Sequence, residues 1–129
     1  MFKNGVTEEQ IIAGMRDDFL ADANKRLSLL RKSREAARNR DCENDSLRVF
    51  RAEVHTLKGM GQAFGFPSLT MISRRLEGYL STHTEEVFAD DDEVALFIDS
   101  IADIVSSGEE PDDDMLDTIL GGLPAPAND

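Results

Sequence analysis

Disulfides and membrane spans are the first things this sequence lacks. Tryptophan is absent from its 129 residues, and Cys42 is the single cysteine. One cysteine cannot form a disulfide within the chain, so an oxidising compartment is not required and we expect a cytoplasmic protein. No apolar run approaches the roughly 18 residues of a membrane span, and the first ten residues lack the apolar core of a signal peptide. Composition therefore argues against a disulfide-stapled secreted domain and against a membrane protein.

Basic residues are absent from the second part of the chain. Residues 76–129 hold 16 acidic residues and no lysine or arginine, whereas all 14 basic residues lie in residues 1–75 beside 10 acidic ones. The overall charge of -12 argues against nucleic acid as a partner, because nucleic-acid binding needs a basic surface. The acidic part can simply be a solubilising surface. Alternatively, the mildly basic part meets an acidic or phosphorylated partner.

Strand signals are also lacking, and helical periodicity takes their place. Thr7 and Gln10 have the spacing of a capping box at the start of a first helix, which we expect to end near Asn39. Asp45 or Ser46 can cap a second helix. Four segments carry apolar residues at steps of three and four. These residues are Ile12, Met15, Phe19, Ala23, Leu27 and Leu30; Leu47, Phe50, Val54, Leu57, Gly61 and Phe64; Leu69, Ile72, Leu76 and Leu80; and Val94, Phe97, Ile98, Ile101, Ile104 and Val105.

Short connections between these segments predict an all-α protein, an antiparallel up-down four-helix bundle over residues 1–108. Pro67 suits the first turn of the third helix. The acidic residues 90–92 suit the start of the fourth helix, and Gly108 ends it. Residues 81–89 read as a loop. The remaining residues, 109–129, form an acidic C-terminal segment, in which a short fifth helix over residues 112–120 precedes a linker that ends in PAPAND.

The string HTLKGMGQAFGF, residues 55–66, places a histidine and several glycines in the middle of the second helix. At 100° per residue, the apolar stripe lies roughly 130° away from His55, so its imidazole should face solvent. The residues in its row include small ones that leave the ring uncovered, and we expect Arg48 and Gln62 of this row, together with Arg51 and Arg74, to contact a partner. This row consists of Arg48, Ala52, Gly59 and Gln62.

Cations lie close to this histidine along the helix. Because helical side chains lean towards the N-terminus, a large residue at position 59 would cover the ring, whereas Gly59 leaves it accessible. Lys58 leans towards the same spot, and Arg51, one turn earlier, can add a second cation. An exposed imidazole beside these cations suits a site that carries a phosphoryl group. Considered by itself, a lone histidine on a helix, such as His55, is usually an ordinary surface residue.

A carboxylate is expected to face His55 from the third helix. The chain turns at about Phe66, and Glu77 follows this turn by eleven residues, as His55 precedes it by eleven. Residues equidistant from the turn of an antiparallel pair lie at the same height. We therefore predict that Glu77 accepts a hydrogen bond from Nδ1–H of His55, which leaves Nε2 as the free nucleophile. An ordinary surface carboxylate is the alternative for Glu77.

The other notable residues point to structure rather than to chemistry. Gly61 and Gly65 suit close helix packing and a helix C-cap, since the context of a phosphate-binding P-loop is missing. His83 falls in the loop, and Cys42 precedes His55 by thirteen residues, too far for a Cys–His pair. Two histidines and one cysteine this scattered form no metal site.

The motif formed by His55, Leu57, Lys58, Gly59 and Gly65 resembles the signature of histidine phosphotransfer (HPt) domains. The wording VHTLKG…FGF is most similar to the N-terminal phosphotransfer domain of CheA-type chemotaxis histidine kinases. The resemblance implies that His55 is phosphorylated at Nε2, that Glu77 orients Nδ1 and that Lys58 stabilises the phosphoryl group. Arg74 departs from the CheA pattern, in which another histidine can occupy this position. It either strengthens phosphate or partner binding or pairs with Glu77 and weakens its hold on His55.

The resemblance also implies partners. A histidine kinase catalytic domain would deliver the γ-phosphoryl group of ATP, and the aspartate of a response-regulator receiver domain would accept it. The chain has no ATP-binding element of its own, so we expect a phosphocarrier that binds no cofactor, with ATP and Mg²⁺ in the kinase and Mg²⁺ in the receiver. An excised domain of a longer kinase is the first interpretation, and a free-standing phosphorelay protein fed by a receiver is the second. A helical adaptor that is never phosphorylated and a hydrolase with a Glu77–His55 dyad remain alternatives.

Overall fold

The computed structural model describes residues 7–38, 43–82 and 92–124, and α-helix is the only regular secondary structure in these ranges. The predictions for Cys42, for His83 and for residues 83–91 lie outside these ranges, as does the tail after residue 124. The helices are α1 (Glu8–Arg38), α2 (Glu43–Ala63), α3 (Pro67–Thr82), α5 (Asp92–Ser107) and α6 (Asp113–Gly121).

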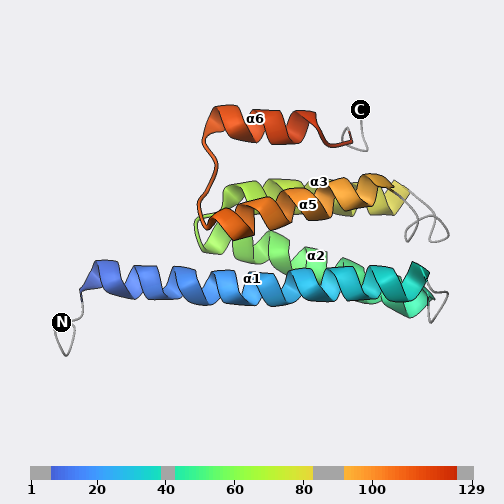
Figure 1. Cartoon of the computed structure of the whole chain (residues 1–129), viewed down its shortest axis with the longest axis horizontal. Helices are drawn as coiled ribbons and strands as arrows, with labels where there is room; N and C mark the ends of the chain where they lie inside the picture. Colours follow the sequence, from blue (N-terminus) through green and yellow to red (C-terminus); the bar gives the residue numbers. More distant parts are fainter. Residues whose placement is uncertain (1–6, 39–42, 83–91, 125–129) are drawn as a thin grey trace.

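Four of the helices form the predicted bundle. In Figure 1, α1, α2, α3 and α5 alternate in direction along one common axis. Contacts join α1 to α2, α2 to α3, α3 to α5 and α5 back to α1, which closes the ring around one core. The all-α antiparallel fold and the short fifth helix are therefore confirmed. Figure 1 shows α6 running along the outside of α3 and α5.

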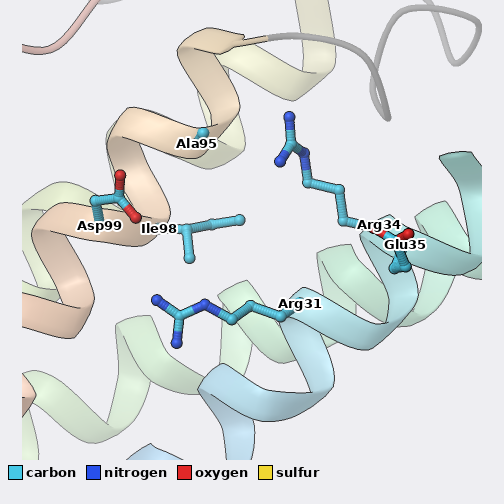
Figure 2. A pocket seen from close by; sticks show the side chains of 6 residues that line it. All are labelled: Arg31, Arg34, Glu35, Ala95, Ile98 and Asp99. Atoms are coloured by element: carbon cyan, nitrogen blue, oxygen red, sulfur yellow. The ribbon is translucent and has the colours of Figure 1, made fainter.

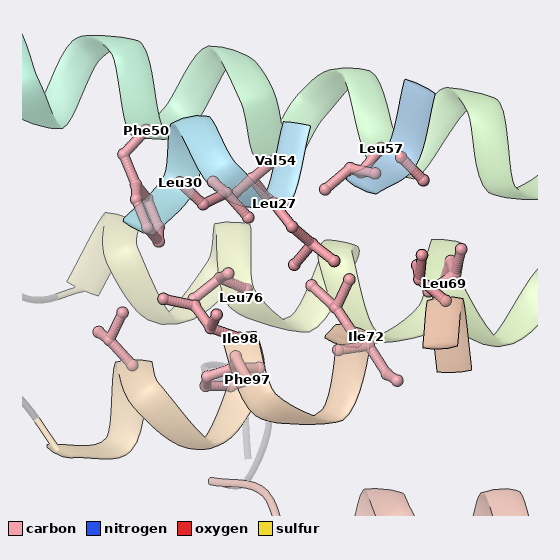
Figure 3. Close-up of a cluster of buried hydrophobic side chains, with 14 of the residues drawn as sticks. Leu27, Leu30, Phe50, Val54, Leu57, Leu69, Ile72, Leu76, Phe97 and Ile98 are labelled. Atoms are coloured by element: carbon pink, nitrogen blue, oxygen red, sulfur yellow. The ribbon is translucent and has the colours of Figure 1, made fainter. Parts of the chain in front are cut away.

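The core is built from the apolar residues that recur along each helix. Figure 3 shows how side chains from all four bundle helices meet in its centre. Burial of large apolar side chains is the main favourable term in folding, each contributing about 1.5–3 kcal/mol. The largest fully buried ones are Phe19, Leu30, Phe50, Val54, Leu57, Phe66, Leu69, Ile72, Leu76, Phe97 and Ile101.

The N-terminal end of α1 is only partly as expected. The capping box is confirmed, because the backbone N–H of Thr7 donates to Gln10 Oε1 at 2.9 Å and that of Gln10 donates to Thr7 Oγ1 at 3.1 Å. The expected core positions Ile12 and Met15 are wrong, since they are 55% and 51% exposed. The physical reason is length: α1 has 31 residues and α2 has 21, so α1 extends past the end of the bundle (Figure 1).

The α2–α3 hairpin positions the site. The expected cap at Asp45 or Ser46 is wrong, because α2 already begins at Glu43 and both residues lie within its first turn. The other end agrees with the sequence: Gly65 has φ +85°, which glycine adopts without strain, and Pro67 opens α3. The intervening Phe66 is buried, so this turn belongs to the core.

The fourth bundle helix and the segment after it are tied to α3. At the end of α5, Gly108 has φ +71°, as expected for a helix stop. Further on, the carboxylate of Glu110 accepts hydrogen bonds from the backbone N–H of Ser68 at 3.1–3.2 Å and from its hydroxyl at 2.5 Å. Arg75 donates to the carbonyl of Leu120 at 2.9 Å. The domain boundary at residue 108 stays a prediction, and these bonds cross it.

Candidate functional site

The imidazole of His55 stands on the solvent-facing side of α2. Its side chain is 71% exposed, whereas the neighbouring Val54 is fully buried in the core. The row on either side is also exposed, and a Cβ added at Gly59 would meet nothing within 4 Å. The open surface beside the ring thus follows directly from the small residues that the sequence places there.

One carboxylate, that of Glu77 on α3, joins two side chains of α2. His55 Nδ1 lies 3.1 Å from Glu77 Oε2, and Lys58 Nζ lies 2.6 Å from Glu77 Oε1. His55 and Lys58 are three residues apart and so share one flank of their helix. Each oxygen of Glu77 therefore has its own partner, and the three side chains form one hydrogen-bonded cluster across the α2–α3 interface.

The charge state of Glu77 follows from these contacts. Partial burial of its carboxyl group, the largest single influence, raises the pKa. The hydrogen bonds from Lys58 and His55, together with the positive charge of both partners, act in the opposite direction and prevail, so the pKa of Glu77 lies below its ordinary value. Glu77 is consequently a carboxylate at neutral pH.

An ionised carboxylate has no proton to donate, and this determines the tautomer of the histidine. Because Glu77 can only accept a hydrogen bond, the proton between Oε2 and Nδ1 belongs to His55. In a neutral imidazole with its proton on Nδ1, the lone pair is on Nε2. The arrangement can therefore present Nε2 as a nucleophile towards solvent.

The register between α2 and α3 depends on a close approach at Gly61. A Cβ at this position would lie 2.9 Å from Leu69 Cβ, from the carbonyl oxygen of Phe66 and from Thr70 Oγ1. The hydroxyl of Thr70 donates to the carbonyl of Lys58 at 2.7 Å. These contacts lock the hairpin between its turn and the cluster, and they hold Glu77 opposite His55.

The remaining sequence-predicted residues do not gather around the ring. Arg51, expected as a second cation beside His55, donates instead to the carbonyl of Leu80 at 3.0 Å. Arg48 Nη1 lies 3.9 Å from Oδ1 of Asp45, which is one turn earlier on α2. Gln62 and Arg74 are exposed. Of the two alternatives for Arg74, pairing with Glu77 is not found in the described ranges, where the carboxylate of Glu77 contacts His55 and Lys58.

Sequence reasoning missed two residues that support this arrangement. Thr70 is the first, and its sole signal is a position facing Gly61 across the hairpin. Arg75 is the second: the departure from the family pattern drew attention to Arg74, but its neighbour holds the end of α6. Periodicity alone could have placed Arg75, because it lies one position from the buried Leu76 and so beside the α3 core face.

A separate pocket lies between α1 and α5 (Figure 2). The pocket is lined by Arg31, Arg34, Glu35, Ala95, Ile98 and Asp99. In Figure 2, two arginines of α1 extend towards α5, and none of the lining residues belongs to the His55 cluster.

Within the described ranges, no group of three or more His, Cys, Asp and Glu residues could hold a metal ion. Nor does any helix in these ranges have the length and apolar character needed to cross a bilayer.

Comparison with known protein families gives a match to the chain. A family model described as the Hpt domain matches residues 14–107, from the exposed end of α1 to the end of α5. The matched range contains α1 from residue 14 onwards, all of α2, α3 and α5, and the His55 cluster, and it excludes α6. No curated protein and no solved structure was found that matches the chain.

Proposed function

The chain belongs to the Hpt domain family, whose members act in histidine phosphotransfer in two-component signalling, and we propose that His55 is the residue that carries the phosphoryl group. A single observation supports this assignment above the others. His55 is 71% exposed, and its Nδ1 is held by the carboxylate of Glu77 at 3.1 Å. A nucleophile needs a free lone pair and access to its target, and Nε2 of His55 has both.

In the proposed reaction, the lone pair of Nε2 attacks the phosphorus of the donor. The new N–P bond forms as the bond from phosphorus to the leaving oxygen breaks, and with ATP as donor the electron pair departs with ADP. The proton on Nδ1 stays in place, so the phosphorylated ring carries a positive charge next to the carboxylate of Glu77. Glu77 thus orients the ring before attack and stabilises the charge that develops during it.

Lys58 is the proposed phosphoryl-stabilising residue. Its ammonium group has three donors, and the bond to Glu77 Oε1 at 2.6 Å uses one of them. The other two can reach towards oxygens of an incoming phosphoryl group on the same flank of α2. Transfer reactions of this kind depend mainly on positioning and on charge stabilisation, which a fixed ammonium group supplies.

The finer assignment is that of a CheA-type phosphotransfer domain in the cytoplasm. In this proposal the kinase catalytic domain binds ATP and Mg²⁺ and phosphorylates His55, and a receiver domain with its own Mg²⁺ then takes the group onto an aspartate. The motif around His55 and the short helix α6 after the bundle support the CheA type. Arg48, Gln62 and Arg74 are exposed for contact with the receiver or the kinase.

Phosphorylation of the 129-residue chain tests the assignment. The chain is incubated with a histidine kinase catalytic domain and radiolabelled ATP, and the stability of the label in acid and alkali is measured. We expect an acid-labile, alkali-stable label that His55→Gln abolishes and that His83→Gln, at the other histidine, leaves in place. A label that persists in His55→Gln would overturn the assignment, and no label with any kinase or receiver would favour the adaptor.

The donor is tested separately. A phosphorylated receiver domain replaces kinase and ATP, and the rates of labelling from the two donors are compared. The CheA-type proposal predicts fast labelling by the kinase. Labelling by the receiver alone would instead identify a free-standing phosphorelay protein. In both cases His55→Gln serves as the control.

A further inference from the structure

The N-terminal part of α1 forms a surface that the phosphotransfer site does not use. We name residues 8–18 of α1 the overhang, because every one of them is exposed and they project beyond the other bundle helices (Figure 1). At 1.5 Å per residue the overhang is about 16 Å long, or about three helical turns. An isolated helix of this length is marginal in water, so a partner along its side would stabilise it.

The overhang has an apolar face that continues the core stripe of α1. Ile12 and Met15 follow the same steps of three and four that lead to the buried Phe19 and Ala23. Phe64, stacked on Phe19 with ring centroids 5.1 Å apart, is 36% exposed at the end of the bundle and extends the apolar surface. The sequence thus encodes a helix-packing face at a place where the described ranges provide no helix to cover it.

The charges that flank this face identify its occupant. Glu8 lies one turn before Ile12, and Arg16 lies one turn after it. Within the described ranges neither has an ion-pair partner, and Arg16 lies over the ring of Phe66 at 5.9 Å. The face therefore runs from negative through apolar to positive. Such an order is complementary to itself when a second copy is placed antiparallel to the first.

We propose that two copies of this chain associate through their overhangs. A two-fold axis at Ile12 places each Ile12 against its counterpart, and it places Arg16 of one copy opposite Glu8 of the other. Because the bundles then lie at opposite ends of the paired helices, they do not compete for space. An anionic membrane surface is a poorer fit, since it offers no positive charge opposite Glu8, whereas a second copy offers Arg16.

The association is weak on its own. Two helices that pair over about three turns bury much less than the roughly 1,200 Å² of a standard interface. We therefore expect a monomer in dilute solution and a dimer that forms across the range from about 10 μM to 1 mM. The two copies make two identical charge pairs and share one apolar seam, so a single substitution acts twice.

Sedimentation equilibrium of the full chain over this range tests the proposal. The weight-average mass of the parent should rise towards twice that of the monomer. Ile12→Asp should weaken association by at least about tenfold, a loss of about 1.4 kcal/mol. Met115→Asp is the matched control, because Met115 on α6 is also 55% exposed, and it should associate as the parent does. Helicity and unfolding of each variant show whether the bundle remains folded.

Charge-reversal variants test whether the partner is a second copy of the chain and whether the two overhangs are antiparallel. Glu8→Arg alone and Arg16→Glu alone should each lose association, since the two-fold then brings like charges together. An equimolar mixture of the two variants should associate, because each supplies the charge that the other lacks. A parent that stays monomeric throughout, a mixture that stays monomeric, or a dimer that survives Ile12→Asp would each overturn the proposal. His55→Gln should dimerise like the parent, so this proposal and the phosphotransfer assignment can fail independently.

Discussion

Glu77 Oε2 lies 3.1 Å from Nδ1 of His55, and this contact joins α2 to α3 beside the exposed imidazole. The same carboxylate binds Lys58 through its other oxygen. One acidic side chain thus determines the orientation of the histidine and the position of the nearest cation. Several measurable properties depend on this single group.

Removal of Glu77 should affect the reaction more than the fold. In Glu77→Ala we expect phosphorylation of His55 to slow on the order of 10- to 100-fold, the loss that is typical when the hydrogen-bond partner orienting a metal-binding histidine is removed. The free energy of unfolding should fall by less than about 1 kcal/mol, because the ion pair is partly exposed. Glu77→Gln, whose amide oxygen can accept the same hydrogen bond, should be intermediate in rate. Equal rates in parent and Glu77→Ala would refute the role.

The stability of the parent should depend on pH through Glu77. Its pKa in the folded chain lies below the ordinary value of 4.5, so its contribution to stability is fully present above about pH 4.5 and is lost as the pH falls through the folded pKa. Glu77→Gln lacks this contribution at every pH. Urea unfolding between pH 7 and pH 3 should therefore show a parent that loses its advantage over Glu77→Gln only below about pH 4.5. If the stability of the parent relative to Glu77→Gln increased as the pH fell, folding would have to raise the pKa of Glu77, which would contradict the prediction.

Replacement of Lys58 should raise the pKa of Glu77. Lys58→Met removes a hydrogen bond and a positive charge that lower this pKa, while the opposing effect of burial persists. Carbon-13 NMR titration of the Glu77 carboxyl group in both proteins measures the change. Lys25→Met, at an exposed lysine of α1, provides a control of the same chemistry and should leave the titration unchanged. An unaltered Glu77 titration in Lys58→Met would mean that the ion pair does not persist in solution.

Gly61 should tolerate no larger residue. A Cβ there would lie 2.9 Å from three atoms, and two of these, the carbonyl oxygen of Phe66 and the Cβ of Leu69, cannot move without the backbone. Gly61→Ala must therefore push the helices apart. We expect a loss of about 1–3 kcal/mol in urea unfolding. Gly14→Ala, where a Cβ meets nothing within 4 Å, is the control and should not destabilise. The displaced α3 should also weaken the His55–Glu77 contact, which the nitrogen chemical shifts of the imidazole report.

Loss of the Glu110 carboxylate should loosen the start of α3. Glu110→Ala leaves the N–H and hydroxyl of Ser68 without their acceptor, which we expect to cost about 1–2 kcal/mol. Glu109→Ala, at the exposed neighbour, should be close to neutral. Hydrogen exchange of the first turn of α3 provides the local measurement. Protection that is unchanged in Glu110→Ala would show that solvent replaces the carboxylate without loss.

The sequence alone predicts the ring of helices, the faces that each buries and the pairing of His55 with Glu77. These follow from local rules: a period of 3.6 for the helices, and equal distances from the turn at Phe66 for the pair. Where α1 extends past its neighbours, the period of 3.6 wrongly predicts that Ile12 and Met15 are buried. Periodicity identifies a face that suits packing, but it does not show whether another helix covers that face.

Long side chains were the least predictable part of the site. Lys58 bonds to Glu77, and Arg51 bonds to a backbone carbonyl of α3. Both residues have several rotatable bonds, and both choose among acceptors that only the assembled bundle brings within reach. The start of α2 was misplaced for another reason, since the residue types that cap a helix also favour its first turn.

The exposure of His55 has a consequence for how long any phosphoryl group would remain on it. A helix offers a convex surface, and within the described ranges the His55 side chain on it is 71% exposed, so bulk water can approach Nε2. The concave half of a reaction chamber must come from whichever protein docks there. The docking protein therefore has to shield the phosphoryl group from hydrolysis. In doing so it also determines which recipient can take the group.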